Sequence, residues 1–410
     1  MNDVVITGLG AVSPVGTSAS ETWDGLKRGQ SGAGPVTLFA PDELAYDYHC
    51  ELGCEVDFDP GDYDCVEEGR MGRYCQIGMV AAQEAIDDAG FGTDPDWDDP
   101  KRTGVSFGSC LGGVDVIERT TIKTHGSGRI SPRLSLKYLA NMPAGYIGIA
   151  FDAQGQNRAP ATACAAGTHA IGAAADDIRL GRADVMIAGG TDTGVSKTIA
   201  CGFDLLRALS NSYDEPATAI RPFDDGRDGF LLGEGAGALI LESAEHAEER
   251  GAEILATVEG SGRSADAEHP IRPASDARGL TSAMEKALAD ANRSPDAIDH
   301  VSAHATATPR GDVHEALSLN RTFDEVPPVT SVKSMIGHTL SAGGAIEAVA
   351  ATKTIEENVI PPTINYETPD PDCDVPVAAE PLETQVDTVM SNSAGFGGTN
   401  GTLILGTYDR

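Results

Sequence analysis

The sequence lacks long apolar runs. No uninterrupted apolar stretch approaches the ~20 residues that a helix needs to cross a bilayer. The opening MNDVVITGLG runs directly into strand-like sequence, with neither a basic leader nor a cleavage site. We therefore expect no membrane partner and a cytoplasmic location.

Basic residues are scarce. The chain has 29 Lys and Arg against 63 Asp and Glu, which gives a formal net charge of -34 at pH 7. A field of this sign repels phosphate, which excludes nucleic acid and anionic membrane surfaces as partners. The acidic residues are scattered rather than gathered in a tail, a pattern that suits concentrated salt, where their repulsion is screened. A halophilic source is therefore one hypothesis, and stability that peaks in dilute buffer would contradict it.

Cysteines are few and irregularly spaced, with eight in 410 residues. Without a secretory signal, this spacing predicts reduced thiols rather than a disulfide framework. His49, Cys50, Cys54 and Cys65 invite comparison with a zinc site, but their spacing matches no standard one, which favours buried or structural thiols. We expect no metal and no cofactor, and the role of this cluster stays open.

Strand-like and helix-like segments alternate along the chain, and apolar residues make up 40% of it. This alternation favours an α/β fold. The predicted strands are 4–8, 104–108, 184–189, 237–241, 254–260, 300–303 and 402–406, and the predicted helices are 75–89, 165–180, 280–291 and 342–356. The length and the charged stretch ESAEHAEERG predict two halves packed as one body, residues 1–251 and 252–410.

The segment GLGAVSPVG is similar to a dinucleotide-binding loop. It lacks the third glycine at the required position, and Pro14 interrupts the start of the helix that should follow. A tight turn is the better interpretation.

Cys164 lies where an extended run meets a helix of small residues, in RAPATACAAGTHAIG. A thiol at a helix N-terminus feels the positive end of the helix dipole, which we expect to lower its pKa and favour the nucleophilic thiolate. The small neighbours leave room for a substrate at the sulfur. A buried structural cysteine would have the same local pattern, so this segment alone does not decide between the two.

Three further segments place reactive groups at the ends of elements. SAHATATPRGD puts His304 at a strand end, followed by Thr306 and Thr308, and SVKSMIGHTLSAGG puts Lys333 and His338 just before a helix. One cysteine, two histidines and one lysine form a set that acyl transfer can use. SNSAGFGGTNGTLIL is a glycine-rich turn before the last strand, which either offers N–H groups to an oxyanion or simply closes a hairpin.

Together these segments resemble the elongating β-ketoacyl-[acyl-carrier-protein] synthases, the ketosynthases of fatty-acid and polyketide assembly. TAC, H-x-T-x-T-P-x-GD, KSMIGH and GFGGTNG occur in the order of that family. The likeness runs from VVITGLGAVSPVG through RPFDDGRDGFLLGEGAGALILE to GFGGTNGTLIL, which is nearly the whole chain. It implies a thiolase-type fold, with two similar halves in a five-layer αβαβα arrangement, and a homodimer.

The resemblance also implies a reaction, the decarboxylative Claisen condensation of an acyl thioester with a malonyl-type thioester to give a 3-oxoacyl thioester. Cys164 would hold the acyl group, and the backbone N–H groups of Cys164 and Phe396 would form the oxyanion hole. His304 and His338 would donate hydrogen bonds to the extender's carbonyl as CO2 departs. Two neutral imidazoles suit that task near neutral pH, because the step needs fixed donors rather than a base.

Supporting roles follow from the same resemblance. Lys333 would orient His304, with Glu347 as its partner. The substrate contacts would be Thr306 and Thr308 for the pantetheine arm, Leu111 and Phe203 for the acyl tunnel, and Phe396 for the gate between the primer and extender steps.

The chain departs from the family pattern near the site. Ala305 and Ala307 replace small polar or glycine positions of the threonine loop, and Ala394 stands where a phenylalanine is usual. Arg133 and Lys137 enter a stretch that is usually more apolar and lies near the acyl tunnel and the dimer seam. We therefore expect a looser or larger pocket and make no prediction of acyl chain length.

The predicted docking surface for an acyl carrier protein is weak. Arg70, Arg73 and Arg207 keep family positions, but Glu67 and Glu68 are added beside the first two. An acidic enzyme and an acidic carrier associate slowly unless salt screens them. CoA thioesters are thus alternative donors, an idea that strict carrier dependence would contradict.

Two other functions stay open at this point. A relative that only decarboxylates or hydrolyses thioesters would be distinguished by its products. An inactive subunit of a larger assembly would fail to take an acyl group on Cys164. The sequence does not name the primer, the extender substituent or the pathway.

Overall fold

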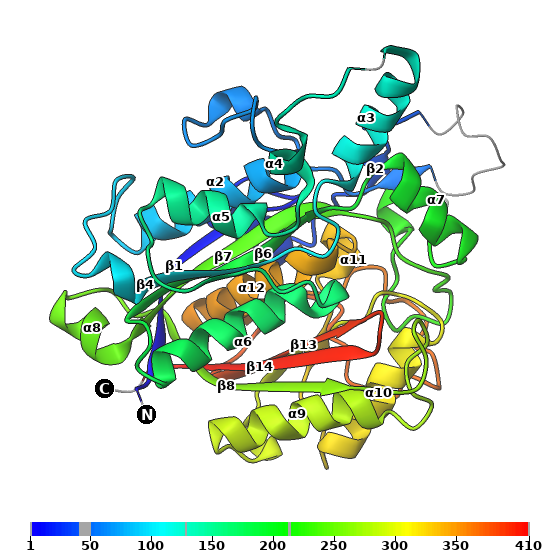
Figure 1. Ribbon diagram of the computed structural model, residues 1–410. Helices are drawn as coiled ribbons and strands as arrows, with labels where there is room; N and C mark the ends of the chain where they lie inside the picture. The colour runs from blue at the N-terminus through cyan, green and yellow to red at the C-terminus, as the bar shows by residue number, and fades with distance from the viewer. Residues whose placement is uncertain (1, 41–50, 128, 212–214, 409–410) are drawn as a thin grey trace.

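Within the described residues, ten strands form one mixed sheet (Figure 1). The computed structural model describes residues 2–40, 51–127, 129–211 and 215–408. The strands stand in the order β10-β9-β13-β14-β8-β1-β7-β6-β4-β5. Their bounds are Val4–Val12 (β1), Thr103–Gly108 (β4), Asn157–Arg158 (β5), Val185–Thr193 (β6), Glu234–Ser243 (β7), Ala256–Ala265 (β8), His300–Ser302 (β9), Val329–Thr330 (β10), Thr388–Gly395 (β13) and Thr399–Gly406 (β14). Two small ribbons pair Gly34–Pro35 (β2) with Leu52–Gly53 (β3) and Val359–Ile360 (β11) with Leu382–Glu383 (β12).

The two halves of the chain meet inside this sheet. Strands β1, β4, β5, β6 and β7 lie together on one side, and β8, β9, β10, β13 and β14 lie together on the other. They join where β1 and β8 pair antiparallel, Val5 opposite Thr257 and Ile6 opposite Ala256. All of β1 is buried, as expected of an apolar strand that is covered on both faces.

Helices lie on both faces of the sheet. Their bounds are Ala19–Lys27 (α1), Arg73–Asp88 (α2), Val114–Ser127 (α3), Leu134–Tyr138 (α4), Met142–Ala150 (α5), Ala166–Arg179 (α6), Lys197–Leu205 (α7), Ala244–Glu249 (α8), Arg278–Ala291 (α9), Gly311–Thr322 (α10), Lys333–Ile336 (α11) and Gly343–Glu357 (α12). Short 3₁₀ turns precede two of them, Ala163–Ala165 (η4) before α6 and Leu340–Ala342 (η7) before α12.

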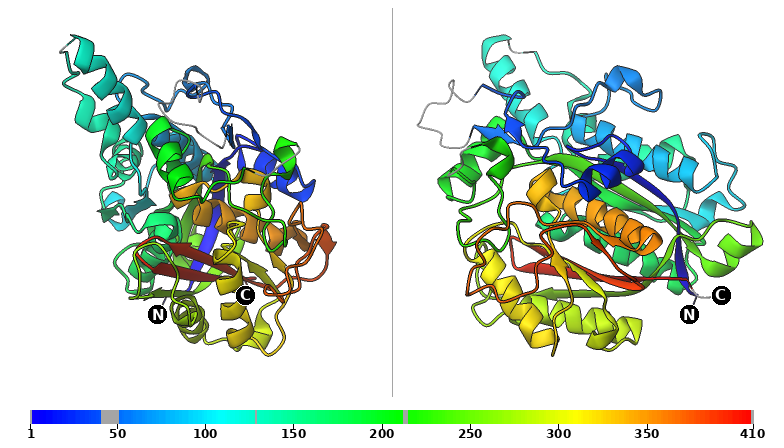
Figure 2. Two further views of the ribbon diagram at one scale, coloured as in Figure 1. Left: turned by 90° about the vertical axis from the view of Figure 1, so that its right-hand side faces the viewer. Right: turned by 180° about the vertical axis from the view of Figure 1, so that it is seen from behind.

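The layers alternate as αβαβα. Helices α6 and α12 pack against strands of both halves and lie between them, as the views from the front and from behind show (Figures 1 and 2). Helices α2 and α5 cover the outer side of the first half, and α9 and α10 cover that of the second. Nearly all of α12 is buried, and its many alanines and glycines let it pack between the two sets of strands. The predicted five-layer fold is thus observed.

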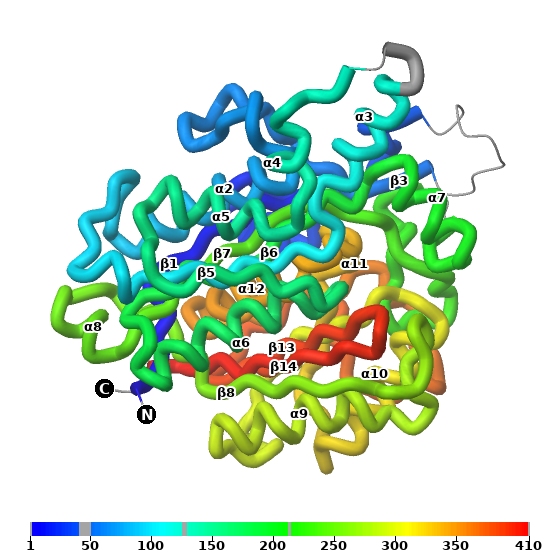
Figure 3. The backbone as a smooth tube through the Cα atoms, viewed as in Figure 1, coloured from blue at the N-terminus to red at the C-terminus, as the bar shows by residue number. Residues whose placement is uncertain are grey.

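Most predicted strands and helices are present with shifted ends. The segment GLGAVSPVG ends in the expected tight turn, in which the backbones of Ser13 and Gly16 are hydrogen-bonded to each other. The sequence prediction missed β13, which lies beside β14 as a hairpin (Figure 3). Its residues TVMSNSAG mix small polar and apolar side chains, so they have no clear period. It also missed α10, where Asp312 and Glu315 are buried although they are charged. Within the described residues, no helix is long and apolar enough to cross a membrane.

Candidate active site

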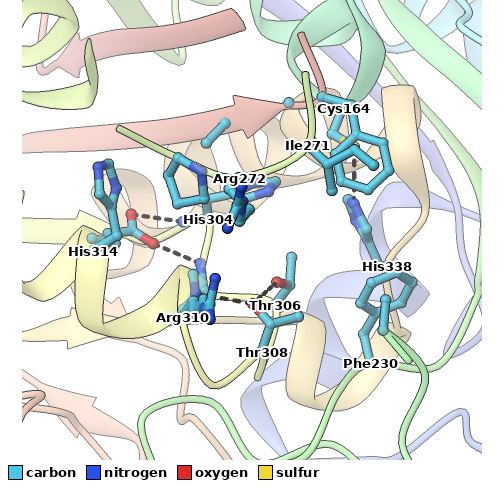
Figure 4. Close-up of a pocket in the computed structure, with 18 of the residues that line it drawn as sticks. Cys164, Phe230, Ile271, Arg272, His304, Thr306, Thr308, Arg310, His314 and His338 are labelled. Carbon is cyan, nitrogen blue, oxygen red and sulfur yellow. Dashed lines mark hydrogen bonds between the residues drawn. The ribbon is translucent and has the colours of Figure 1, made fainter. Parts of the chain in front are cut away.

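Cys164 lies at the start of α6, where the sequence places it. It belongs to the short turn η4, and the preceding Ala163 has a φ of 50°, a left-handed conformation that costs a non-glycine residue energy. This sharp bend turns the chain from the strand region into the helix. The sulfur thus faces a cavity rather than the sheet (Figure 4).

His338 contacts the sulfur. Its Nε2 lies 3.1 Å from Cys164 Sγ. The imidazole follows Gly337, whose φ is 70° and where a Cβ would lie 2.8 Å from Cys54 Sγ and 2.9 Å from the Leu231 carbonyl oxygen. Only glycine fits this bend without strain, and the bend carries His338 from α11 to the thiol.

The ionisation of the thiol differs from the sequence prediction. Burial raises the pKa of the Cys164 thiol to about 12, while the Lys333 ammonium and the backbone N–H groups of Cys164 and Phe396 lower it in part. Burial and Lys333 hold the pKa of His338 well below its usual range. The prediction of a thiolate was therefore wrong, because loss of water outweighs the Lys333 charge and the two N–H groups. The resting pair is a neutral thiol and a neutral imidazole, whose Nε2 can take the thiol proton when it is unprotonated.

His304 lies beside His338, with ring centroids 5.4 Å apart and the rings nearly perpendicular. It follows β9, and its backbone N–H donates to Glu315 Oε1 at 2.9 Å, while the N–H of Ala305 donates to Oε2 at 2.7 Å. Burial, Lys333 and His338 keep the pKa of His304 well below its usual value, so this ring is also neutral.

Glu315 is a site residue that the sequence analysis missed. It comes from α10, is buried, and holds the backbone of the His304 loop. Burial raises its pKa to about 7 although the two N–H donors oppose the shift. Its signal in the sequence is weak, because a glutamate in a helix is ordinarily solvent-exposed.

Lys333 and Glu347 form a buried ion pair below the two histidines. The side chains are 1% and 0% exposed, and the ammonium donates to Glu347 Oε1. Lys333 begins α11 and Glu347 lies in α12, so the pair ties two elements of the second half together. The pair holds a positive charge near Cys164 and both imidazoles.

The glycine-rich segment closes a hairpin, which is one of the two alternatives that the sequence allowed. It is the turn of the β13–β14 hairpin, and its Phe396 N–H reaches Cys164 Sγ. Gly398 has a φ of 69°, and a Cβ there would lie 2.8 Å from the Asp266 side chain. The Phe396 ring lies 5.8 Å from that of Phe203, which also lines the cavity.

A cavity of about 470 Å³ leads from the surface to these groups (Figure 4). Thr306 and Thr308 line its wall, with hydroxyl oxygens 3.3 Å apart. Phe203 and Phe230 give it apolar surface near His338. Leu111, which the sequence analysis placed in an acyl tunnel, is not among the lining residues, and its N–H donates instead to Asp192 at 3.1 Å.

Three arginines line the outer part of this cavity. Arg207 was predicted to face a partner, whereas Arg272 and Arg310 were not singled out. Within the described residues, none of the three has an ion pair or a side-chain hydrogen bond, although many other arginines of the chain pair with carboxylates. Such pairs include Arg158 with Asp177 and Arg179 with Asp290.

One predicted docking residue is placed elsewhere. Arg73 is 19% exposed and its guanidinium is held by the wholly buried Glu234 and by the Val56 carbonyl oxygen at 2.8 Å. Its donors are used inside the protein, so little of this guanidinium is left for a carrier contact. Arg70 is exposed but pairs with Glu67 at 2.9 Å.

Lys137 and Arg133, which depart from the family pattern, lie against the loop that carries Glu67 and Glu68. Lys137 Nζ donates to the Glu68 carbonyl oxygen at 2.9 Å, and Arg133 is exposed beside Gly69. Lys137 is thus engaged within the protein, whereas Arg133 is exposed.

The cysteine cluster offers no metal site that can be described. His49 and Cys50 lie outside the described residues, whereas Cys54 is buried and Cys65 is half-buried. Across the part of the chain that the structure covers, no group of histidines, cysteines and carboxylates is arranged to hold a metal ion.

Known families match the chain in two adjoining segments. Residues 1–247 match the model described as the N-terminal domain of β-ketoacyl synthase, and residues 255–367 match that of its C-terminal domain. The chain belongs to the β-ketoacyl synthase family. As a β-ketoacyl synthase it is a condensing acyltransferase, and the family predicted from the motifs is confirmed.

Individual relatives agree with the family. The 3-oxoacyl-[acyl-carrier-protein] synthase 2 of Coxiella burnetii is 43% identical over 410 residues, which cover 98% of each chain. A solved β-ketoacyl synthase from Burkholderia phymatum is 35% identical with a TM-score of 0.90, over 100% of both chains. The AntDE:AntF complex, a type II polyketide acyl carrier protein with its ketosynthase bound to the hexaketide, contains a chain that is 30% identical with a TM-score of 0.90 over 100% of both chains. The thiolase-type fold is thus confirmed.

Proposed function

We propose that this β-ketoacyl synthase holds an acyl group on Cys164 and condenses it with a malonyl-type extender. The observation that carries the assignment is the contact of Cys164 Sγ with both His338 Nε2, at 3.1 Å, and the Phe396 N–H, at the inner end of one cavity. A nucleophile, a proton acceptor and an oxyanion donor meet there.

In the first half-reaction the sulfur attacks the carbonyl carbon of the primer thioester while its proton moves to His338 Nε2. The N–H groups of Cys164 and Phe396 hold the oxyanion. The primer's C–S bond breaks, and the departing thiolate takes the proton from His338. The acyl group is then on Cys164 and the imidazole is neutral again.

In the second half-reaction the bond between the malonyl α-carbon and its carboxylate breaks, CO2 leaves, and the electron pair forms an enolate. The His304 ring N–H donates to the enolate oxygen, and His338 donates to it as its Nε2–H tautomer. The α-carbon attacks the acyl carbonyl, and collapse of the oxyanion releases the 3-oxoacyl thioester and the Cys164 thiolate, which takes a proton from water. Lys333, paired with Glu347, keeps both imidazoles neutral and oriented.

The mass of the adduct on Cys164 after a panel of acyl thioesters is offered tests the first half-reaction. We expect an acyl adduct on wild type and none on Cys164→Ala. His304→Ala should keep the adduct but lose condensation, by a factor on the order of 10² or more. An adduct followed only by free acid or by decarboxylated extender would identify a hydrolase or decarboxylase instead. No adduct would identify an inactive subunit.

The arginines at the mouth support recognition of the donor's arm. Arg272, Arg310 and Arg207 have no partner of their own within the described residues, and Thr306 and Thr308 continue the wall inward. A phosphate on a pantetheine arm would meet these cations while the arm passes the threonines. A relative with a bound acyl carrier protein supports that carrier as a donor, and CoA has a pantetheine phosphate too.

The double variant Arg272→Gln, Arg310→Gln should raise KM for carrier-borne and CoA-borne malonyl groups by about tenfold or more, with little effect on malonyl-pantetheine, which has no phosphate. Equal loss on all three donors would contradict this role. Comparison of the first two donors on wild type separates carrier protein from CoA.

A homodimer is supported by one open side of the sheet. Strand β5 is an edge strand that pairs only with β4 within the described residues. Ile149 and Leu139, on and near α5, are 79% and 41% exposed. An unpaired edge next to apolar side chains suits a second copy of the chain. Light scattering should give twice the monomer mass, and a monomer at micromolar concentration would contradict it.

A further inference from the structure

Ala394 is a small residue in the wall of the active-site cavity. It belongs to β13, two residues before Phe396, and lines the same cavity as Cys164 and His304. The adjacent Gly395 packs so closely on the nucleophile's backbone that a Cβ there would lie 3.0 Å from the Cys164 nitrogen. The size of residue 394 therefore affects the space next to the reacting atoms.

Strand geometry tells which part of the cavity Ala394 faces. Side chains two residues apart on a strand share a face, so Ala394 points the same way as Asn392. The Asn392 side-chain amide reaches Glu315 Oε1 at 3.4 Å, and Glu315 holds the backbone N–H groups of His304 and Ala305. Ala394 thus faces the His304 loop.

This is the side of the extender. The acyl chain on Cys164 is expected to run past the pair of rings Phe203 and Phe396, whereas the extender reaches His304 along Thr306 and Thr308. A group attached to the extender's α-carbon would therefore meet residue 394. Where a phenylalanine would fill this space, alanine leaves it open.

The residues of the cavity wall favour one kind of substituent on the extender's α-carbon. Ala305, Leu280 and Gly398 also line the cavity and are apolar. The nearby carboxylates have partners already, since Asp266 accepts from Asn400 Nδ2 at 2.9 Å and Glu315 accepts two N–H groups. An added anion would be repelled by both, whereas a small alkyl group would gain contact and lose water.

We propose that the space at Ala394 admits a methyl or ethyl substituent on the α-carbon of the malonyl-type extender. This inference rests on the proposed condensation. The step is otherwise unchanged, because CO2 leaves from the same α-carbon, that carbon bonds to the acyl carbonyl, and the product is a 2-alkyl-3-oxoacyl thioester. Ala394 is then a specificity-determining residue of this enzyme.

The test compares malonyl and methylmalonyl donors on the same thiol carrier. The carrier is the one that supports condensation of malonyl, and the masses of the products are measured. We expect wild-type kcat/KM for methylmalonyl within about thirty-fold of that for malonyl, below the upper end of the roughly 10–200-fold that one methylene is worth in a hydrophobic pocket. Ala394→Phe should lower the methylmalonyl value at least about tenfold more than the malonyl value. Ala394→Leu should fall between the two.

Two controls keep the outcomes apart. Ala289→Phe, at an exposed position on α9, adds the same bulk away from the cavity and should leave the ratio of the two donors unchanged. Formation of the acyl adduct on Cys164 reports that each variant is folded. If the enzyme condenses malonyl but has a kcat/KM for methylmalonyl lower by more than about thirty-fold, the inference is overturned and the proposed function stands. A ratio that Ala394→Phe does not change would also overturn it, and failure of both donors would overturn the condensation itself.

Discussion

At the residue scale, the neutral state of Cys164, the proposed nucleophile, and of its two histidine partners sets how the site works. The Cys164 thiol has a pKa of about 12 because it is buried, and both imidazoles have pKa values far below their usual range. A thiol that loses its proton only when a thioester is present resists oxidation between turnovers.

Alkylation by iodoacetamide measures the ionisation of Cys164, because only the thiolate reacts. With a pKa of about 12, the rate should rise about tenfold per pH unit from pH 7 to pH 10 without a plateau. The Cys164→Ala variant corrects for the other thiols. A plateau between pH 7 and pH 8 would mean that the helix dipole and Lys333 outweigh burial.

The buried pair Lys333–Glu347 separates a structural from a functional contribution. Lys333→Met should cost about 3–5 kcal/mol in the free energy of unfolding, because it leaves Glu347 buried and unpaired. The double variant Lys333→Met, Glu347→Met should recover most of that stability, measured by urea unfolding. It should still condense poorly, because the positive charge proposed to orient His304 is gone. Recovery of activity together with stability would reduce Lys333 to a structural role.

At the scale of elements, the site is assembled from ends and turns. The start of α6, the loop after β9, the bend after α11 and the tip of the β13–β14 hairpin each bring one group. The elements themselves supply rigid positions, and the turns supply direction. The hairpin tip is the most exposed of these pieces, with Phe396 39% exposed.

Gly398→Ala tests the hairpin tip. A Cβ at this position meets the Asp266 side chain at 2.8 Å, and the φ of 69° disfavours any L side chain by about 1–2 kcal/mol. We expect the turn to shift and the Phe396 N–H to leave the sulfur. Loss of one oxyanion donor should lower kcat by about tenfold or more with a small change in KM. Gly92→Ala, also at positive φ but with open space around the Cβ, is the matched control and should keep kcat.

At the scale of the whole molecule, charge and layering have separate consequences. The five layers bury the central helices α6 and α12, which pack against each other. Helix α6 follows Cys164, and α12 carries Glu347 of the Lys333–Glu347 pair. The surface carries the excess of acidic residues, and the formal net charge is -34. Self-repulsion of this size destabilises the compact state in dilute buffer.

Salt should therefore stabilise the protein. Raising KCl from 0.1 M to 2 M shortens the Debye length from about 10 Å to below about 3 Å, which screens repulsion between surface carboxylates. We expect Tm to rise by about 5 °C or more, followed by circular dichroism at fixed pH, with light scattering to check that the oligomeric state is unchanged. Sucrose at matched osmolality serves as the control. A Tm that falls with KCl would contradict a halophilic adaptation.

Several features could be read from the amino-acid sequence, because their causes are local in the chain. Apolar segments of period 2 or 3.6 identify β1, β6, α2 and α6, and the order of four short motifs identifies the family and the set Cys164, His304, Lys333 and His338. Residue types at element ends are enough for that, since the chemistry needs those groups and turns need those glycines.

Other features depend on groups distant in the chain. The neutral thiol follows from burial by residues of both halves, the inward position of Arg73 follows from Glu234 on β7, and Glu315 acts because α10 packs beside the His304 loop. The cluster of Arg272 and Arg310, and the open space at Ala394, likewise arise where separate loops converge. Desolvation and pairing depend on distances between such groups. Local composition therefore determined the fold and the reactive residues, whereas packing determined their charge states and the shape of the cavity.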